Sequence, residues 1–528
     1  MTPDDATADG AGEGAGQSQS RPGAKAAAYG RRQFLARAGG GVVALGLAGL
    51  VGYEWPHGSG PQATAKVPEV RGGGPSSVEY FFTRPDLVPP RVKVTRYARG
   101  IGRAPSYIFL AARNYISGAP GQAGLMIVDR RGRLVWFKPL QAAPFDFNEQ
   151  SYRGRPVLTW WEGKVVYDYG MGTGEMADGS YRRQRPLHAG DGLRADLHEL
   201  QLTKAGTVLL TAYQGVDADL SSRGGPRKGR VVSGHAQEID IATGKVLLDW
   251  DSLGHVGLDE SYQRVHRTGE WDYFHINSID EMPDGNLLIS ARNTWALYKV
   301  DRSNGKVIWR LNGKRSDFTM GPGARFFWQH DGRAHGTSKL SVFDDGASPR
   351  EERQSRGLLL RVDDRSMHVG LEQAYLHPAG FLAANQGNVQ VLPGGRVFVG
   401  WGDQPYFSEF APDGSLLLDG QLPIGYHSYR AYLRDWVGKP SEPPVAAARH
   451  NPAGGAVVYA SWNGATAVRR WTALAGKDRA SLAPVGSEDW DGFETAIAVS
   501  SSGPYYAVAA VDASGAELGR SAPVRAPT

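Results

Sequence analysis

Short aliphatic runs separated by polar, glycine-containing turns recur along most of the chain. Each unit has an aliphatic stretch that ends near Asp, a turn with Gly, and a second aliphatic stretch that ends in Trp or another large residue. This alternation predicts β-strands, and the short turns between them predict hairpins. The clearest copies span residues 126–136, 238–250 and 298–309, with weaker ones at 360–363 and 410–418.

A second hairpin precedes most of these units, at residues 202–210, 279–289 and 389–399. Two hairpins make a four-stranded unit, and such units repeated every 40–50 residues are typical of β-propeller blades. The sequence therefore predicts a six-bladed β-propeller over residues 78–437. Five or seven blades, or a tandem of two β-sandwiches, are the structural alternatives. The predicted blades lie near residues 104–140, 150–190, 196–250, 272–312, 328–378 and 384–422.

The pattern changes after Pro440, where Ser441-Glu442-Pro443-Pro444 reads as a linker. Residues 441–528 then contain short alternating strands and predict a small β-sandwich of the fibronectin type III or Ig-like kind. Its expected role is packing or surface attachment. The predicted fold class of the whole chain is all-β.

The first seventy residues have a different character. Residues 1–28 are rich in Gly, Ala, Ser and Asp and predict a disordered leader. The pair Arg31-Arg32 and the apolar run at 38–53 resemble a twin-arginine export signal. The alternative is an uncleaved N-terminal anchor. We expect an extracytoplasmic protein, secreted or membrane-anchored, that meets a membrane only through this segment.

The composition excludes several kinds of functional site and partner. The chain has no Cys, which excludes disulfides, thiol nucleophiles and thiolate metal sites. Its formal net charge is +5 without a long basic run, so nucleic acid is not an expected partner. Seventy Gly, 14 Trp and 22 Tyr agree with many turns and strands.

Three histidines occupy one matched position in the repeat. His198, His275 and His330 each open the first strand of a predicted blade. Innermost strands line the axis of a propeller, so these side chains are expected to converge at one mouth. Arg292 ends the return strand of the hairpin that begins at His275 and is expected beside it. The alternative is that each histidine only caps a strand.

Three histidines and an arginine can together bind an anion. A neutral imidazole serves as a nucleophile, while the other groups stabilise charge on transferring oxygens, as sulfuryl or phosphoryl transfer requires. The sequence contains no P-loop pattern, so a nucleotide donor is not indicated. A three-histidine metal site is a further alternative, but Arg292 beside it opposes a cation, so neither a metal nor a cofactor is predicted.

Other polar residues are interpreted as structural. His335, His377, His427 and His450 fall in predicted loops or turns and are expected at the surface. The acidic pair Asp344-Asp345 is expected in a solvated turn, as is Asp363-Asp364.

Several segments together resemble the arylsulfotransferase family, specifically its branch in actinobacteria and fungi. The resemblance covers about residues 78–475. It implies a six-bladed propeller and a PAPS-independent aryl-sulfate sulfotransferase, which moves a sulfuryl group from a phenolic sulfate ester to a phenol by a ping-pong mechanism through a sulfohistidine. The segments are residues 272–280, 285–292, 305–318, 328–331 and 340–344, with shorter matches at 84–87 and 459–466.

By motif position, the resemblance implies that His330 is the nucleophile and that His275 and Arg292 hold the sulfuryl oxygens. His198 would assist the phenolic oxygen, as acid and then as base. Asn277 is predicted as a further donor of the substrate-binding site. The natural donor and acceptor do not carry over from the family.

Two other functions remain open on sequence alone. One is a non-enzymatic extracytoplasmic propeller that binds a ligand or cell-wall polymer. The other is a quinoprotein-like dehydrogenase, a fold that usually needs eight blades.

Overall fold

The computed structural model describes residues 77–98, 101, 106–115, 120–265, 270–451, 454–501 and 503–526. These residues form β-strands and short 3₁₀ helices, with no α-helix among them, so the predicted all-β class is confirmed. The predicted leader and signal at 1–70 lie outside this described part. Within it, none of the helices has the length and apolar character that a membrane span needs. The 3₁₀ helices are η1 (Ser221–Arg223), η2 (Leu258–Glu260), η3 (Arg292–Thr294) and η4 (Pro393–Gly395).

The repeated turn explains the hairpins. Between strands β15 (Ala296–Val300) and β16 (Val307–Leu311), the Asp301 carboxylate accepts the Ser303 N–H at 2.8 Å. Gly305 then adopts a φ of +75°, a conformation that costs glycine least. An Asp at the strand end followed by Gly therefore reverses the chain, as the sequence pattern predicts.

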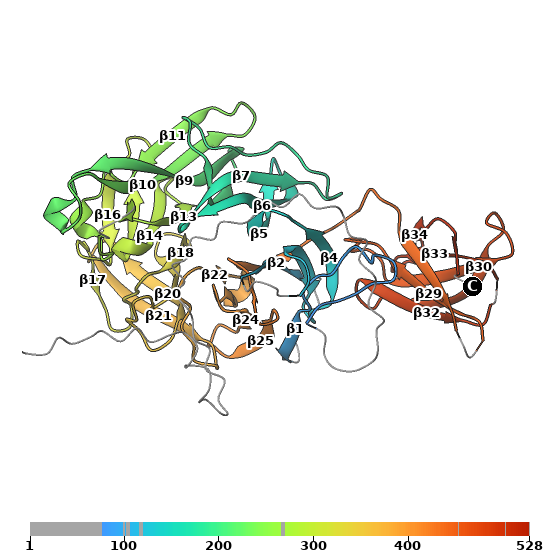
Figure 1. Ribbon diagram of the computed structural model, residues 1–528. Helices are drawn as coiled ribbons and strands as arrows, with labels where there is room; N and C mark the ends of the chain where they lie inside the picture. The colour runs from blue at the N-terminus through green and yellow to red at the C-terminus, as the bar shows by residue number, and fades with distance from the viewer. Residues whose placement is uncertain are drawn as a thin grey trace, which may run out of the picture. The chain divides into compact units, whose positions relative to one another are not determined.

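Antiparallel strands follow one another along the chain (Figure 1). The first sheet takes strands from both ends of this region, because the late strands β26 and β27 pair with β2. Its strands are β2 (Ser106–Asn114), β3 (Gly124–Asp129), β4 (Leu134–Pro139), β26 (Tyr426–His427) and β27 (Ala431–Asp435).

The next two predicted blades share one sheet. Strands β7 and β8 are joined in it through the pair Gly172 and Ala195. Because the two groups are continuous here, the count of six blades stays a prediction. The strands are β5 (Ala143–Tyr152), β6 (Arg155–Val166), β7 (Tyr169–Ala177), β8 (Ala195–Leu202), β9 (Thr207–Ala218), β10 (Gly229–Asp240), β11 (Val246–Asp251) and β12 (Glu270–Asp272).

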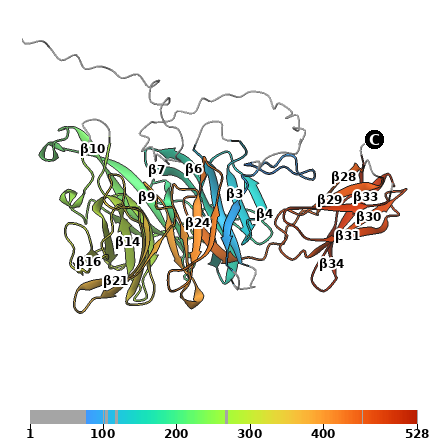
Figure 2. The ribbon, with the colours of Figure 1, turned by 90° about the horizontal axis from the view of Figure 1, so that it is seen from below.

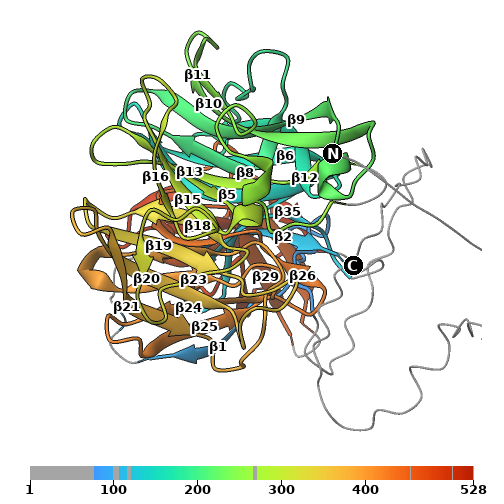
Figure 3. The same cartoon turned by 90° about the vertical axis from the view of Figure 1, so that its left-hand side faces the viewer.

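Three further sheets complete this region. In Figure 3 the strands β18 to β21 lie side by side, in the order that their pairing gives. The N-terminal strand β1 (Lys93–Tyr97) pairs with β25, so the last of these sheets also joins distant parts of the chain. The remaining strands are β13 (Ile276–Glu281), β14 (Leu287–Ala291), with β15 and β16; β17 (Thr319–Met320), β18 (His330–Ala334), β19 (Lys339–Asp344), β20 (Arg356–Asp363), β21 (His368–Leu376); and β22 (Asn388–Val391), β23 (Val397–Gly400), β24 (Tyr406–Phe410), β25 (Leu416–Gln421).

The C-terminal strands form two further sheets, shown in Figure 2. Both contribute to one hydrophobic cluster around Val458, Trp471 and Val508. The fibronectin-like assignment and the boundary at residue 441 stay predictions. The strands are β28 (Val445–His450), β29 (Ala456–Ser461) and β32 (Glu494–Val499) in one sheet, and β30 (Arg470–Gly476), β31 (Ala483–Asp489), β33 (Tyr505–Val511), β34 (Glu517–Arg520) and β35 (Val524–Arg525) in the other.

Candidate functional site

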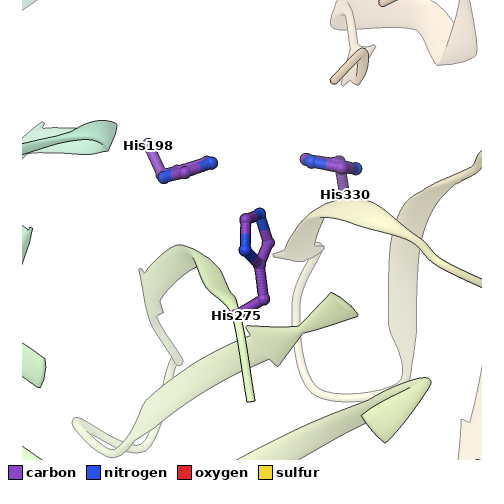
Figure 4. Close-up of side chains that lie close together, drawn as sticks. All are labelled: His198, His275 and His330. Carbon is purple, nitrogen blue, oxygen red and sulfur yellow. The ribbon is translucent and has the colours of Figure 1, made fainter. Parts of the chain in front are cut away.

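The structure brings the three matched histidines together. His198 lies in β8, His275 directly precedes β13, and His330 is the first residue of β18. Their rings converge on one space (Figure 4), and one ring nitrogen from each lies within 4.8 Å of the others. All three side chains are buried.

Each imidazole is held through Nδ1 by one carboxylate. This leaves the opposite nitrogen, Nε2, as the atom that a ligand or substrate meets when Nδ1 carries the proton. The Nδ1–Oδ2 distances are 2.7 Å for His198 and Asp196, 2.6 Å for His275 and Asp272, and 2.8 Å for His330 and Asp345.

Local backbone geometry fixes two of these pairs. Asp196 also accepts the backbone N–H of His198 at 2.9 Å and the hydroxyl of Thr211 at 2.9 Å. Asp272 accepts the backbone N–H of His275 at 2.9 Å. His275 has a φ of +57°, a left-handed conformation that is uncommon outside glycine. Each Asp therefore holds both the main chain and the ring of its histidine.

His330 is the most secluded of the three, with 1% of its surface exposed. The Gln386 N–H donates to its Nε2 at 3.3 Å, which assigns the lone pair to Nε2 and the proton to Nδ1. Burial lowers the pKa of the ring well below its usual range, and the neighbouring Arg292 lowers it further. Burial also raises the pKa of the Asp345 carboxyl well above its usual range. His330 is therefore a neutral imidazole at neutral pH.

His198 is also biased toward the neutral form. Burial lowers its pKa below the usual value, although Asp196 acts in the opposite direction. The protonated His198 ring is therefore a stronger acid than an exposed histidine, and its neutral ring is available as a base.

Arg292 stands beside His275 as expected. Its backbone N–H donates to the His275 carbonyl at 2.9 Å, at the start of η3. The guanidinium lies 4.9 Å from the centre of the Trp328 ring and donates to Asn293 Oδ1 and Ala384 O, each at 3.0 Å. Its Nε is buried and has no hydrogen-bond partner among the residues that the structure describes. One charged donor is therefore left to meet an anion.

Asn277 lies behind the site. It is fully buried, and its Nδ2 donates to the carbonyl of Gln329, the residue before His330, at 2.7 Å. Within the described part of the chain, its Oδ1 has no hydrogen-bond partner. The described contact of Asn277 is thus with the backbone that carries His330.

A buried arginine connects the strands that carry the histidines. Arg430 Nη1 lies 3.0 Å from Asp146 and 3.3 Å from Glu199, and its Nε lies 3.3 Å from Asp331. Its Nη2 donates to the Asn277 carbonyl at 3.0 Å. Because Glu199 and Asp331 each follow a site histidine, Arg430 fixes the backbone of the cluster.

A family model described as Arylsulfotransferase (ASST) matches residues 148–422, just over half of the chain. The chain belongs to the arylsulfotransferase family. The match includes all three histidines, their Asp partners and Arg292, and it supports aryl sulfotransferase activity in general. No curated protein matches the chain.

Solved structures give weaker likenesses. A protein of unknown function from Bacteroides caccae is 12% identical, with a TM-score of 0.38, over 63% of this chain and 99% of its own. A virginiamycin B lyase from Staphylococcus aureus is 8% identical, with a TM-score of 0.31, over 62% of this chain and 88% of its own. Similarities this weak say nothing about the chemistry of this arylsulfotransferase-family chain.

Sequence reasoning missed the three carboxylates. Asp196 and Asp272 stand two and three residues before their histidines, and this spacing was a readable signal. Asp345 was wrongly expected in a solvated turn: Asp344 and Asp345 are both fully buried, because Arg356 and His330 pair with them.

Two further expectations about histidines are also wrong. His377 and His427 are buried, not at the surface. His377 contacts Asp419 at 3.1 Å, and His427 contacts Arg113 at 2.8 Å. These partners are distant in sequence, which is why the loop pattern gave no sign of them.

Proposed function

We propose that the chain is an exported, PAPS-independent aryl-sulfate sulfotransferase that works by a ping-pong mechanism through a sulfohistidine at His330. The observation that carries the proposal is the three-ring cluster, in which each Nδ1 is held by a carboxylate and one ring nitrogen from each histidine lies within 4.8 Å of the others. Family membership supports the reaction class.

In the first half-reaction, the Nε2 lone pair of His330 attacks the sulfur of an aryl sulfate. The N–S bond forms, the bond between sulfur and the aryl oxygen breaks, and the phenolic oxygen takes a proton from protonated His198. The sulfated ring gains positive charge, which the Asp345 carboxylate stabilises through Nδ1–H.

In the second half-reaction, a phenolic acceptor gives its proton to neutral His198. The acceptor oxygen attacks sulfur, the N–S bond breaks, and the lone pair returns to His330. His198 ends protonated and ready for the next donor, so the protons balance over the cycle. The Arg292 Nε–H is the donor that we assign to the sulfuryl oxygens, and the His275 ring is a second donor in the form in which both of its nitrogens carry protons.

The decisive experiment follows nitrophenolate release from 4-nitrophenyl sulfate, with and without phenol, in the absence of any nucleotide donor. We expect phenol-dependent release and a transient sulfuryl adduct on the peptide that contains His330, detected by intact and peptide mass. His330→Ala should abolish both. His235→Ala is the matched control, because His235 also binds an Asp through Nδ1, at 2.9 Å, outside the cluster.

Full activity of His330→Ala, or an adduct on another residue, would overturn the assignment of the nucleophile. Absence of release and of adduct with several aryl sulfates would instead favour the binding propeller.

We further propose that the sheets from β2 to β25 form six blades, with β5–β7 and β8–β11 as separate blades of one continuous sheet. The single pair that joins β7 to β8 supports this division. Export by the twin-arginine route rests on Arg31-Arg32 and the apolar run after them, and fractionation of cells that express the full chain tests it.

A further inference from the structure

We propose that His198, His275 and His330 also form a binding site for one divalent transition-metal ion of the zinc class. Imidazole nitrogen is a preferred ligand of such ions, and three histidines with an open fourth position are a common protein site for zinc. The described residues place three such nitrogens within 4.8 Å of one another on three separate strand starts.

Small ring movements complete the geometry. A zinc–nitrogen bond is about 2.0–2.1 Å, so ligand nitrogens in a tetrahedral site lie about 3.3 Å apart. Closing from the present separation requires each nitrogen to move inward by less than about 1 Å. The three rings already face one space (Figure 4), and His330 Nε2 would exchange the Gln386 N–H, 3.3 Å away, for the ion.

The surroundings of the rings match those of metal ligands. A metal-binding histidine usually donates its other ring N–H to a carboxylate or carbonyl, which orients the ring and makes the ligand nitrogen more basic. All three histidines have this contact, at 2.6–2.8 Å. A nucleophile and a general base do not require the third member, His275, to be held in the same way.

The charge balance also permits a dication. Arg292 opposes a cation, and this was the sequence argument against a metal. That argument omitted Asp196, Asp272 and Asp345, which contact the rings directly. These acidic partners stand opposite the charge of Arg292, so the surroundings of the rings are not purely cationic.

Occupancy has a functional consequence that rests on the proposed function. A metal ion on His330 Nε2 engages the lone pair that attacks sulfur, so it competes with the sulfuryl donor. The same site would then be a sulfotransferase centre when free of metal and an inhibited centre when it holds zinc.

The test begins with binding, not activity. The purified full chain, freed of metal with a chelator, is titrated with Zn²⁺ by calorimetry and with Co²⁺ by visible absorption. We expect one saturable site per chain and the ligand-field bands of tetrahedral Co²⁺. His275→Gln should weaken Zn²⁺ binding at least 100-fold, and Asp272→Asn by about 10–100-fold, as expected for an outer-shell partner. His235→Gln, which removes a histidine from a similar His–Asp pair elsewhere, should leave binding unchanged.

Absence of a saturable site, or His275→Gln binding as tightly as the unaltered chain, would overturn the inference. Equal loss in His235→Gln would also overturn it, since the effect would then not be specific to the cluster. A chain that binds Zn²⁺ at this site but transfers no sulfuryl group would refute the proposed function alone. An active transferase that binds no metal would refute this inference alone.

Discussion

At the scale of single residues, the site is a set of matched pairs. Each histidine is oriented by a carboxylate, and the carboxylates differ in their own anchoring. Asp196 and Asp272 accept the backbone N–H of their own histidines, whereas Oδ1 of Asp345 is buried with no hydrogen-bond partner in the described ranges. The Asp345 carboxylate contacts His330 through Oδ2, so replacing Asp345 tests this pair directly.

Replacing Asp345 with Asn should slow sulfuryl transfer by about 10²–10⁴-fold, because an amide donor facing Nδ1 favours the tautomer with its proton on Nε2. The measurement is kcat for 4-nitrophenyl sulfate with phenol, together with the rate of adduct formation in a single turnover. Asp249→Asn, which alters the His235 pair, is the control and should change neither rate. Equal rates in Asp345→Asn and the unaltered chain would show that Asp345 does not position the nucleophile.

The three histidines and Arg292 could be predicted from the sequence more readily than the residues that hold them. Equivalent positions in a repeated hairpin can be recognised in a single sequence, because the repeat is a local periodic pattern. Asp345 lies 15 residues from His330, in an acidic pair that resembles an ordinary turn. The contacts of Arg430 cross from 99 positions, to Asp331, to 284 positions, to Asp146, so only the closed fold brings them together.

At the scale of elements, the innermost strands are tied together by charge. Arg430 contacts residues of β5, β8 and β18, and the backbone of β13. A guanidinium suits this position because its five donors point in fixed directions within one plane. The starts of three of these strands carry the site histidines, so the geometry of the cluster depends on this junction.

Arg430→Met should destabilise the fold by about 3–5 kcal/mol, because it removes the cation that pairs with the buried Asp146 and leaves Glu199 and Asp331 to share Arg333 alone. Urea unfolding followed by tryptophan fluorescence measures this loss. Arg434→Met is the control: Arg434 lies in the adjoining strand β27 and contacts Asn148 at 3.0 Å, so it should cost only about 1 kcal/mol.

Where Arg430→Met does not fold, Arg430→Lys can be measured in its place. Lysine keeps the positive charge but lacks the planar guanidinium, so this variant should lose less stability. Unchanged stability of both variants would contradict the role of Arg430 as a junction.

At the scale of the whole described unit, segments that are distant in the chain hold each other. The segment before β1 contacts the first residue of β32: Glu494 accepts the backbone N–H groups of Phe82 and Thr83 and the Thr83 hydroxyl, at 2.6–3.1 Å. Beside them, the rings of Phe81 and Phe493 lie 4.4 Å apart. One carboxylate thus links the start of the described chain to its C-terminal sheets.

Glu494→Ala should destabilise the fold by about 1–3 kcal/mol, since it removes the acceptor of two backbone N–H groups. We expect the lower stability in urea unfolding and faster hydrogen exchange at residues 81–83. Glu488→Ala, at an exposed carboxylate of β31, is the control and should have little effect. Unaltered exchange at Thr83 in Glu494→Ala would show that this contact does not hold the segment.

The position of Arg430 in the chain also sets an order of events during synthesis. A ribosome makes the chain from its N-terminus, so all three histidines leave it before Arg430 and before β27, which pairs with β2. A partly made chain thus has every ring of the site but not the residue that ties their strands together. The cluster therefore reaches its final geometry only after Arg430 and β27 have been made.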